Sequence, residues 1–277
     1  MLRSHTCGEL RKEHIDQKVD LYGWARSVRD HKDIFFINLT DRYGWTQVIA
    51  KKEQCKDLNR ESFVRIQGKV IPRTPENINS KVPTGEIEVE CEKIEIVSQC
   101  KVLPFDVQDN IDVKEELRLK YRFLDIRRPI MISRLEFRAK LASCIRRCLE
   151  KQNFLEIETP SFVRSTPEGS RDFLVPSRTM PGCFYALPQS PQLYKQMLMI
   201  SGIDRYFQFP HCFRDEDARR ERQVVHTQLD VEMALVTQDD IFKVVEGVMN
   251  SIYKELFQIE IKTPFEHHTY SECMNRW

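Results

Sequence analysis

Apolar and polar residues alternate along most of the N-terminal third of the chain. Successive side chains of a β-strand point to opposite faces, so this alternation predicts strands with one buried face. Residues 72–85 are rich in Pro, Asn and Gly, which is typical of a long loop. The predicted strands cover residues 18–29, 33–40, 45–50, 62–71 and 85–97.

The last of these runs changes phase. Ile87, Val89 and Cys91 occupy odd positions, whereas Ile94 and Ile96 occupy even ones. An extra residue in the strand, a β-bulge, would keep one apolar face across such a slip. Five short strands with a bulge are typical of a small closed barrel of the OB type, which we assign to residues 1–102.

Helical spacing appears beyond the predicted barrel. Residues 103–130 are interpreted as a linker and hinge, and apolar residues recur at helical intervals over 131–151, with Ser133 as the expected cap. Strand-like runs then alternate with helical ones. Predominantly antiparallel strands with flanking helices predict an α+β domain over residues 131–277. The later helical runs are 191–201 and 240–257.

Composition bounds the class of protein. Of 277 residues, 41% are hydrophobic and 31% are charged, which favours a packed core over disorder. No apolar run approaches the length of a membrane span, and the N-terminus lacks the apolar stretch of a secretory signal. Nine cysteines without a Cys-x-x-Cys pair indicate reduced thiols. We therefore expect a cytoplasmic protein with no disulfide framework, no metal site and no membrane partner.

The hinge carries a local excess of positive charge although the net charge of the chain is only +1. Between Arg118 and Lys151 there are 11 basic and 3 acidic residues, a local net charge of +8. One interpretation is a solvated helix surface. The other is a phosphate-facing segment beside a barrel that binds nucleic acid.

The predicted barrel has aromatic residues beside basic ones. Barrels of this type stack unpaired bases on aromatic rings and hold the nucleic-acid backbone with Arg and Lys. Adjacent strand residues point to opposite faces, so we expect one of Phe35 and Phe36 in the core and the other on the surface. The aromatic and basic residues of the barrel that we expect to be exposed side by side are Tyr22, Trp24, Arg26, Arg29 and one of Phe35 and Phe36.

Residues 213–233 predict a strand, a highly charged loop and a second strand. Arg214 follows Phe213 of an apolar strand and precedes three acidic residues. A guanidinium held at a sheet edge suits a phosphate or a carboxylate. The alternative is a surface hairpin with solvated ion pairs, which contribute little to stability.

These segments resemble those of the aspartyl-tRNA synthetases of the bacterial type, which are class II enzymes, and they occur in the same order along the chain. The likeness extends from Cys7 to Trp277 and includes the first two class II motifs, the substrate-covering loop, the amino-acid recognition segment, the hinge and the start of the anticodon-binding barrel. The two class II motifs are residues 153–160 and 213–233, the substrate-covering loop is 166–172 and the recognition segment is 189–196. The hinge is 117–128, and the start of the barrel contains CGELR and YGWARSVRDH.

The resemblance implies a two-step reaction. The family joins L-aspartate to the α-phosphate of ATP, with Mg²⁺ and no bound organic cofactor, and then transfers the aspartyl group to tRNA(Asp). The substrate carboxylate attacks phosphorus directly, so catalysis is mostly positioning and charge neutralisation. By position, Arg214 is the catalytic residue that bridges aspartate and the α-phosphate. The implied ATP site is Arg214, Asp215, Glu216, Gln223 and His226, and the implied aspartate site is Glu168, Ser190, Gln192, Lys195 and Arg214.

Further roles follow from the same resemblance. Lys195 would pair with the side-chain carboxylate of aspartate, which disfavours an asparaginyl or lysyl enzyme. The ammonium group of aspartate would be held by Glu168, Ser190 and Gln192. In the barrel, Phe36 would stack an anticodon base. Arg29, Asp30 and Gln47 would contact base edges or the RNA backbone, and Pro160 would belong to a homodimer interface.

The chain departs from the family in two places. The family's Arg-Gln-Pro-Glu-Phe-Thr-Gln is replaced by Arg-Gln-Val-Val-His-Thr-Gln at 222–228, so His226 stands where the family stacks Phe on adenine. The sequence also ends before the third class II motif, so the domain 131–277 is incomplete. We expect this chain alone not to form aspartyl-adenylate at a useful rate. The alternative function is a non-catalytic paralogue that binds tRNA or another RNA through the barrel.

Overall fold

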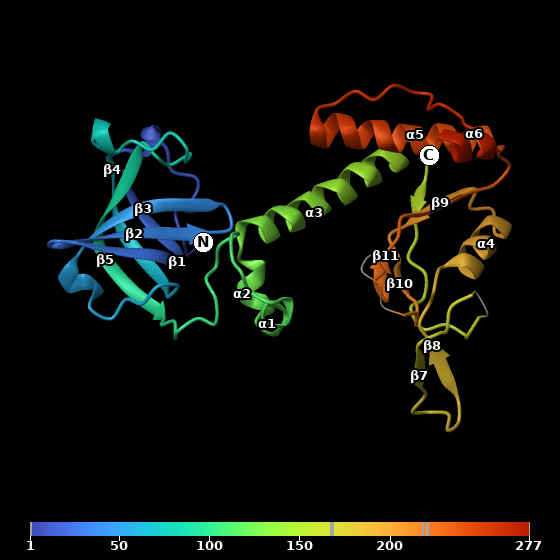
Figure 1. Cartoon of the computed structure of the whole chain (residues 1–277), viewed down its shortest axis with the longest axis horizontal. Helices are drawn as coiled ribbons and strands as arrows, with labels where there is room; N and C mark the ends of the chain where they lie inside the picture. Colours follow the sequence, from blue (N-terminus) through green and yellow to red (C-terminus); the bar gives the residue numbers. More distant parts are fainter. Residues whose placement is uncertain (1, 167–168, 218, 220–221, 277) are drawn as a thin grey trace. The chain divides into compact units, whose positions relative to one another are not determined.

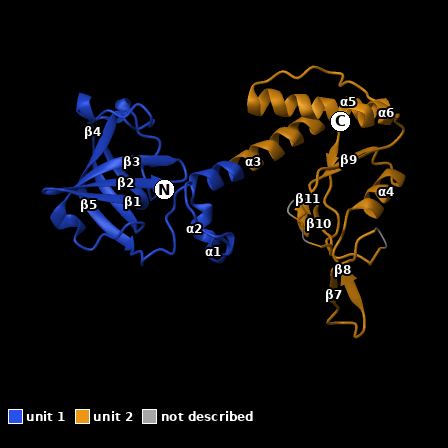
Figure 2. Cartoon of the chain, in the orientation of Figure 1, with its two compact units in different colours: residues 1–135 blue, residues 136–277 orange. Residues whose placement is uncertain are grey.

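The computed structural model describes residues 2–166, 169–217, 219 and 222–276. The chain divides into two compact units, Met1–Leu135 and Glu136–Trp277 (Figure 2). The division falls inside the long helix α3 (Pro129–Glu150), so each unit contains part of that helix.

The first unit begins with a closed five-stranded barrel (Figure 1). Its strand order is β1-β2-β3-β5-β4, and β3 pairs with β5 in parallel while the other neighbours are antiparallel. Fully buried residues such as Leu21, Ile37, Val48 and Ile66 alternate with outward-facing ones and fill the interior. The strands are β1 (Lys18–His31), β2 (Ile34–Asp41), β3 (Gly44–Lys51), β4 (Phe63–Pro72) and β5 (Ile87–Ser98).

The predicted β-bulge is confirmed. Gln67 of β4 pairs with Lys93, whereas the next residue, Gly68, pairs with Cys91, so Glu92 is the extra residue of β5. A second irregularity separates Ala25 from Ser27 in β1. Beyond it, Ser27 and Arg29 rather than Arg26 and Val28 share the outer face of that strand, since Val28 packs against the core.

The residues after the barrel form short helices with a small core of their own. Helices α1 (Glu115–Lys120) and α2 (Arg122–Ile126) precede α3. Phe105, Val107 and Leu124 are buried together there. Asp125, which is fully buried, accepts hydrogen bonds from neighbouring arginines of the same segment. The segment interpreted as a hinge therefore has defined packing within the first unit.

The second unit combines small sheets with helices, in agreement with the predicted α+β class. A three-stranded sheet has the order β12-β9-β6, in which β9 and β12 are antiparallel and β6 and β9 are parallel. Two antiparallel pairs, β7-β8 and β10-β11, accompany it. The strands are β6 (Leu155–Glu156), β7 (Leu174–Pro176), β8 (Phe184–Ala186), β9 (Arg205–Gln208), β10 (His211–Phe213), β11 (Val225–Thr227) and β12 (Asp230–Met233).

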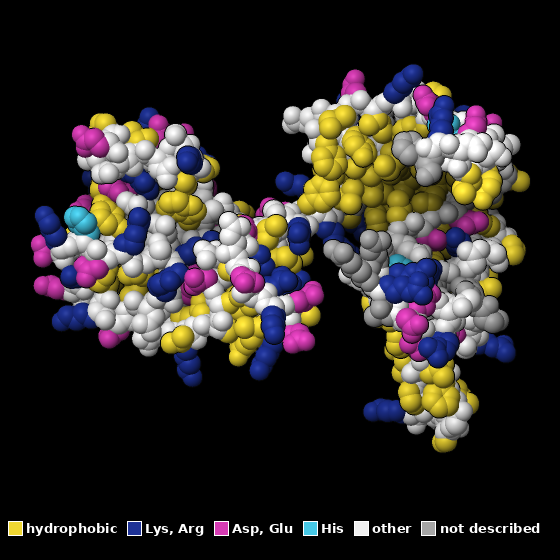
Figure 3. All heavy atoms as spheres, viewed as in Figure 1, with side chains coloured by type: hydrophobic (Ala, Val, Ile, Leu, Met, Phe, Trp, Pro, Cys, Tyr) yellow, Lys and Arg dark blue, Asp and Glu magenta, His cyan; other side chains and the backbone are white. Residues whose placement is uncertain are grey.

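Helices cover one side of this sheet. Ile145 and Leu149 of α3 pack with Phe207 of β9 and with Val244 of α5. Figure 3 shows a concentration of apolar side chains over the end of α3 and α5. The helices of this unit are α4 (Gln192–Ile200), α5 (Gln238–Ile252), which continues as a π-helical turn (Tyr253–Phe257), and α6 (Tyr270–Arg276). Among the described residues, no helix is both long enough and apolar enough to cross a bilayer.

Candidate active site and candidate nucleic-acid interface

The strands β10 and β11 and the charged loop that joins them form a hollow of about 400 Å³. Arg214 follows β10 directly, and its backbone N–H donates to the carbonyl of Val224 at 2.9 Å, which extends the strand pairing by one residue. The guanidinium of Arg214 is thereby held at the edge of the hairpin. The hollow is lined by Arg214, Glu216, Arg222, Gln223 and His226, so the structure brings together four of the five residues predicted for ATP.

Asp215, the fifth predicted ATP residue, connects the hairpin to the substrate-loop segment. Its backbone N–H donates to the carbonyl of Arg171 at 3.1 Å, and the hydroxyl of Ser170 donates to the carboxylate of Glu216. This hydrogen bond, with the nearby charge of Arg222, holds the pKa of Glu216 below its ordinary value. Glu168, predicted for the aspartate ammonium, lies outside the described residues.

A buried amide that we did not predict anchors the same loop. Gln189 is only 4% exposed, and its amide nitrogen donates to the carbonyl of Ser170 at 2.8 Å and to the carboxylate of Asp172. Asp172 also accepts from the hydroxyl of Ser165 at 2.6 Å. Burial would raise the pKa of Asp172, but these hydrogen bonds outweigh burial and lower it. Ser165, Ser170 and Asp172 are therefore tied, directly or through one another, to the start of the amino-acid recognition segment.

Lys195 lies on α4 between two carboxylates of β12. Its Nζ is 3.0 Å from Asp230 Oδ1 and 3.1 Å from Glu232 Oε2, and the side chain is 12% exposed. Burial opposes the charge, but hydrogen bonds to both carboxylates outweigh it, so the pKa of Lys195 is raised. Lys195 is not among the described residues that line the hollow around Arg214. Asp230 and Glu232 are therefore further candidate site residues. Both belong to the segment 213–233, but we did not single them out from the sequence.

The other residues predicted for aspartate and for the dimer lie near α4. Gln192 is its first residue and is partly exposed. Ser190 lines a small recess together with Pro160 and Gln208, and Pro160 itself is exposed. The recess is of about 20 Å³, too small for an amino acid.

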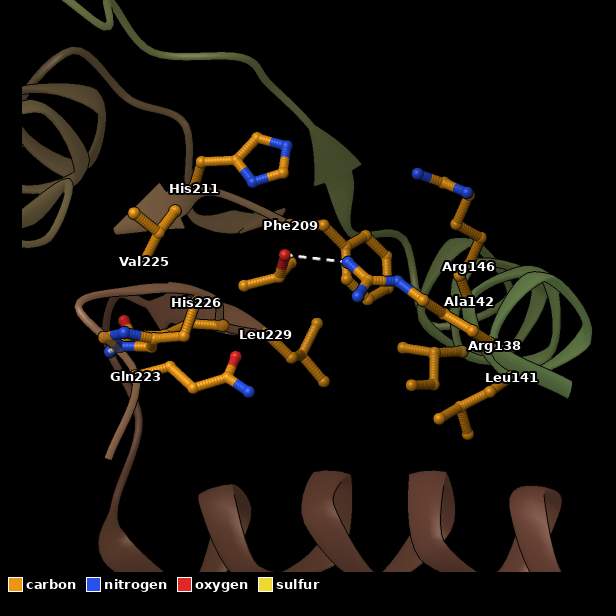
Figure 4. A pocket seen from close by; sticks show the side chains of 13 residues that line it. Arg138, Leu141, Ala142, Arg146, Phe209, His211, Gln223, Val225, His226 and Leu229 are labelled. Atoms are coloured by element: carbon orange, nitrogen blue, oxygen red, sulfur yellow. Dashed lines mark hydrogen bonds between the residues drawn. The ribbon is translucent and has the colours of Figure 1, made fainter. Parts of the chain in front are cut away.

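A larger hollow of about 860 Å³ lies between residues 138–146 of α3 and the hairpin (Figure 4). Arg138 of α3 donates to Thr227 Oγ1 at 2.8 Å across it, the bond drawn in the figure. Leu141 and Phe209 supply apolar walls. Gln223 and His226 line both hollows, so the β11 segment separates the two spaces.

In the first unit, three of the four residues predicted for RNA share one face of the barrel. Arg29 pairs with Phe36 across β1 and β2, and Arg29 Nη2 donates to Gln47 Oε1 at 3.4 Å. Phe35 packs against the core, as predicted for one residue of the Phe35–Phe36 pair, and Phe36 is partly exposed. Asp30 is paired instead with Lys52 at 2.8 Å.

Two of the predicted aromatic residues have protein partners on the barrel surface. The rings of Trp24 and Phe63 are 5.0 Å apart, and those of Tyr22 and Phe63 are 6.3 Å apart. The guanidinium of Arg127 lies 4.3 Å from the centre of the Trp24 ring. These contacts fasten α2 to the barrel within the first unit, so Tyr22 and Trp24 have a packing role there.

Comparison with known proteins identifies the family. Residues 114–277 match the model of the class II tRNA synthetases for D, K and N, and residues 19–97 match the OB-fold nucleic acid binding domain. The chain therefore belongs to the class II tRNA synthetases of the D, K and N group.

Individual relatives agree with this assignment. The chain is 50% identical over 278 residues to the aspartate–tRNA ligase of Pseudothermotoga lettingae, and 50% identical over 282 residues to the aspartate–tRNA(Asp/Asn) ligase of Thermotoga neapolitana. Each match covers all of this chain and 48% of the relative, so the chain spans about half the length of these curated relatives. The asparaginyl-tRNA synthetase of Pyrococcus horikoshii, solved with asparaginyl-adenylate, is similar with a TM-score of 0.80 and 27% identity, over 94% of this chain and 59% of that one.

Proposed function

We propose that this chain serves as the N-terminal part of an aspartate–tRNA ligase. Its substrates are L-aspartate, ATP and tRNA(Asp). In the first step an aspartate carboxylate oxygen bonds to the α-phosphorus as the bond to the β-phosphate breaks and pyrophosphate leaves. In the second step a ribose hydroxyl of the terminal adenosine of the tRNA displaces AMP from the aspartyl carbonyl.

The observation that carries this proposal is the convergence of Arg214, Glu216, Gln223 and His226 on one hollow. The charge that develops in phosphoryl transfer lies on the phosphate oxygens, and a positioned guanidinium stabilises it. Arg214 would neutralise the α-phosphate and the attacking carboxylate together. Gln223 would hold ATP by hydrogen bonds and His226 would stack against adenine.

Selection of aspartate would rest on Lys195. Asp230 and Glu232 keep this ammonium group charged and hold it in place, although its positive charge is shared with them. A free aspartate side chain would take a hydrogen bond from Lys195, and Gln192 and Ser190 would contact the amino-acid ammonium group. A neutral asparagine side chain would gain less from the same ammonium group.

The remaining parts of the proposal concern assembly and ions. Pro160 would lie in a homodimer interface, and the protein would act in the cytoplasm, where tRNA is charged. Mg²⁺ would arrive with ATP. Among the described residues, no group of three or more His, Cys, Asp or Glu is arranged to hold a metal ion.

The test is ATP binding by the purified chain, measured by titration calorimetry. Removing the guanidinium in Arg214→Gln should weaken binding at least about tenfold, because a charge-assisted contact to a phosphate is lost. Arg178→Gln, at an exposed arginine between β7 and β8, is the matched control. Equal affinity of Arg214→Gln and wild type would contradict the assigned role.

The alternative, an RNA-binding protein without ligase activity, is favoured by a different observation. The barrel has a complete core of its own and carries Arg29, Phe36 and Gln47 on one face. Filter binding with tRNA(Asp), set beside calorimetric titrations of the chain with ATP and with aspartate, separates the two. RNA binding without binding of ATP or aspartate would support the alternative.

A further inference from the structure

Rows of side chains cross the outer face of β1, β2 and β3. Along β2 the buried residues Ile37 and Leu39 alternate with Phe36, Asn38 and Thr40, which are the outward-facing residues. The strand register places Phe36 between Arg29 and Ile49. It places Asn38 between Ser27 and Gln47, so an entirely polar row lies beside the row that contains Phe36.

Two oxygens of the polar row have no hydrogen-bond partner among the residues that the structure describes. Ser27 Oγ and Asn38 Oδ1 are shielded from solvent and form no hydrogen bond within the described part of the chain. Buried polar atoms are nearly always paired in native proteins, because an unpaired one loses its bond to water without compensation. Ser27 and Asn38 lie opposite each other and each has an unpaired buried oxygen, so this arrangement needs a physical explanation.

Gln47, the third member of the row, already forms hydrogen bonds with both ends of its amide group. Its Oε1 accepts from Arg29 Nη2 at 3.4 Å, and its Nε2 donates to Glu88 Oε2 at 2.9 Å. The unused hydrogen-bonding capacity of the row therefore lies on Ser27 and Asn38. Rotation of either side chain toward the surface would break no existing bond of its oxygen.

The unused hydrogen-bonding groups of Ser27 and Asn38 lie where a single-stranded nucleic acid could reach them. Adjacent rows along a strand are separated by about 6.7 Å, the rise of two residues. If Phe36 stacks one unpaired base, the neighbouring base of the strand lies over Asn38 and Ser27. An amide and a hydroxyl can each donate to and accept from a base edge, whereas the aromatic ring of Phe36 contacts every base in the same way.

We propose that Asn38, assisted by Ser27, is a specificity-determining residue that reads the edge of the base next to the one stacked on Phe36. This inference rests on the proposed function, in which the barrel binds the anticodon of tRNA(Asp). It assigns stacking to Phe36 and base discrimination to the adjacent polar row.

The experiment uses the full chain and an anticodon stem-loop of tRNA(Asp), with three further stem-loops that each carry one replaced anticodon base. Dissociation constants are measured by filter binding at one fixed salt concentration. Asn38→Leu, similar in size but without hydrogen-bonding groups, should weaken binding of the parent stem-loop about tenfold and abolish discrimination at one anticodon position only. Thr46→Val is the matched control, because Thr46 Oγ1 is also unpaired but lies on the fully buried inner face of β3.

The outcomes separate the two proposals. If wild type distinguishes the stem-loops and Asn38→Leu distinguishes them equally well, the role of Asn38 is overturned and the proposed RNA binding stands. If wild type shows no preference among the stem-loops, both the role of Asn38 and the proposed binding of the anticodon by the barrel are overturned. Should Asn38→Leu lack the thermal transition of wild type, Asn38→Ser and Ser27→Ala replace it, and full discrimination by both would again overturn the inference.

Discussion

His226 lies where the two hollows of the second unit meet, with its Nε2 3.4 Å from the amide nitrogen of Gln228. An imidazole offers less area for stacking on adenine than a phenyl ring does. We therefore expect His226→Phe to bind ATP about two to five times more tightly than wild type, measured by titration calorimetry. His211→Phe, the same change on the paired strand and outside the smaller hollow, is the control. Equal affinity of His226→Phe and wild type would count against adenine stacking.

Asp125 is a buried carboxylate held by arginines, with Arg128 Nη1 2.8 Å and Arg118 Nη1 3.7 Å away. Burial would raise its pKa, but hydrogen bonding and charge from the arginines outweigh burial and lower it below 3.8. Asp125→Asn should reduce the unfolding free energy by about 2–4 kcal/mol near neutral pH, because it leaves guanidinium groups unpaired.

The pH dependence of that loss has a definite sign. The folded-state pKa of Asp125 is the lower one, so the ionised carboxylate stabilises the fold above pH 3.8 and this contribution disappears as the pH falls through the folded-state value. The difference between wild type and Asp125→Asn in urea unfolding should therefore narrow as the pH falls below 3.8. Asp112→Asn, at an exposed residue of the same segment, should behave as wild type.

At the scale of residues, the sequence predicted positions better than partners. Arg214, Gln223 and His226 could be placed together because they belong to one hairpin whose strands are near each other in the chain. The anchoring of the substrate loop by Gln189 and the pairing of Lys195 with Asp230 join segments separated by 17 to 35 residues. Contacts between residues so far apart in the chain depend on how α4 and β12 pack, and a local sequence pattern does not predict that packing.

At the scale of elements, the start of α3 shows a tertiary cap. The helix begins at Pro129, which has no N–H to satisfy, and the N–H of Ile130 donates to Asp109 Oδ1 at 3.0 Å. Ser133, the expected cap, lies inside the helix and donates to the carbonyl of Ile130 at 2.9 Å, so that prediction was wrong. The true cap comes from 21 residues upstream, beyond the reach of a local motif.

The cap can be tested directly. Asp109→Ala should lower the unfolding free energy of the first unit by about 1 kcal/mol, the usual effect of losing a helix cap. Thermal unfolding followed by circular dichroism measures the change. Gln108→Ala is the control, because the bond from Arg128 Nε to residue 108 uses the backbone carbonyl and survives the substitution. A wild-type midpoint for Asp109→Ala would show that the cap adds nothing.

The barrel strands and their bulge could be predicted because each long strand has one fully buried face, which fixes the period of the pattern. The strands of the second unit are two to four residues long, too short to show a period of their own. Their existence was inferred from apolar content, and β11 and β12 were read as one continuous run. Pairing partners decide such short strands, not sequence pattern.

At the scale of the whole molecule, the basic run of residues 118–151 is partly neutralised within each unit. Six of its 11 basic side chains form ion pairs with carboxylates of the described residues, three of them with the same carboxylate, Asp125, which favours a structural role for these six. The paired side chains are Arg118, Arg122, Arg127, Arg128, Arg146 and Arg147. Any contact of this run with RNA phosphates would therefore involve chiefly its other members.

The two units have separate buried clusters, one inside the barrel and one between α3, α5 and β9. Calorimetry should therefore resolve two unfolding transitions, each sensitive to its own ligand. At about 100 times its dissociation constant a ligand stabilises the unit that binds it by about 2.7 kcal/mol. ATP should raise only the transition of the second unit and the anticodon stem-loop only that of the first, with hydrogen exchange of peptides from each unit identifying the transitions. A single transition raised by both ligands would show that the units unfold together, and a stem-loop that raises neither would remove the barrel from RNA binding.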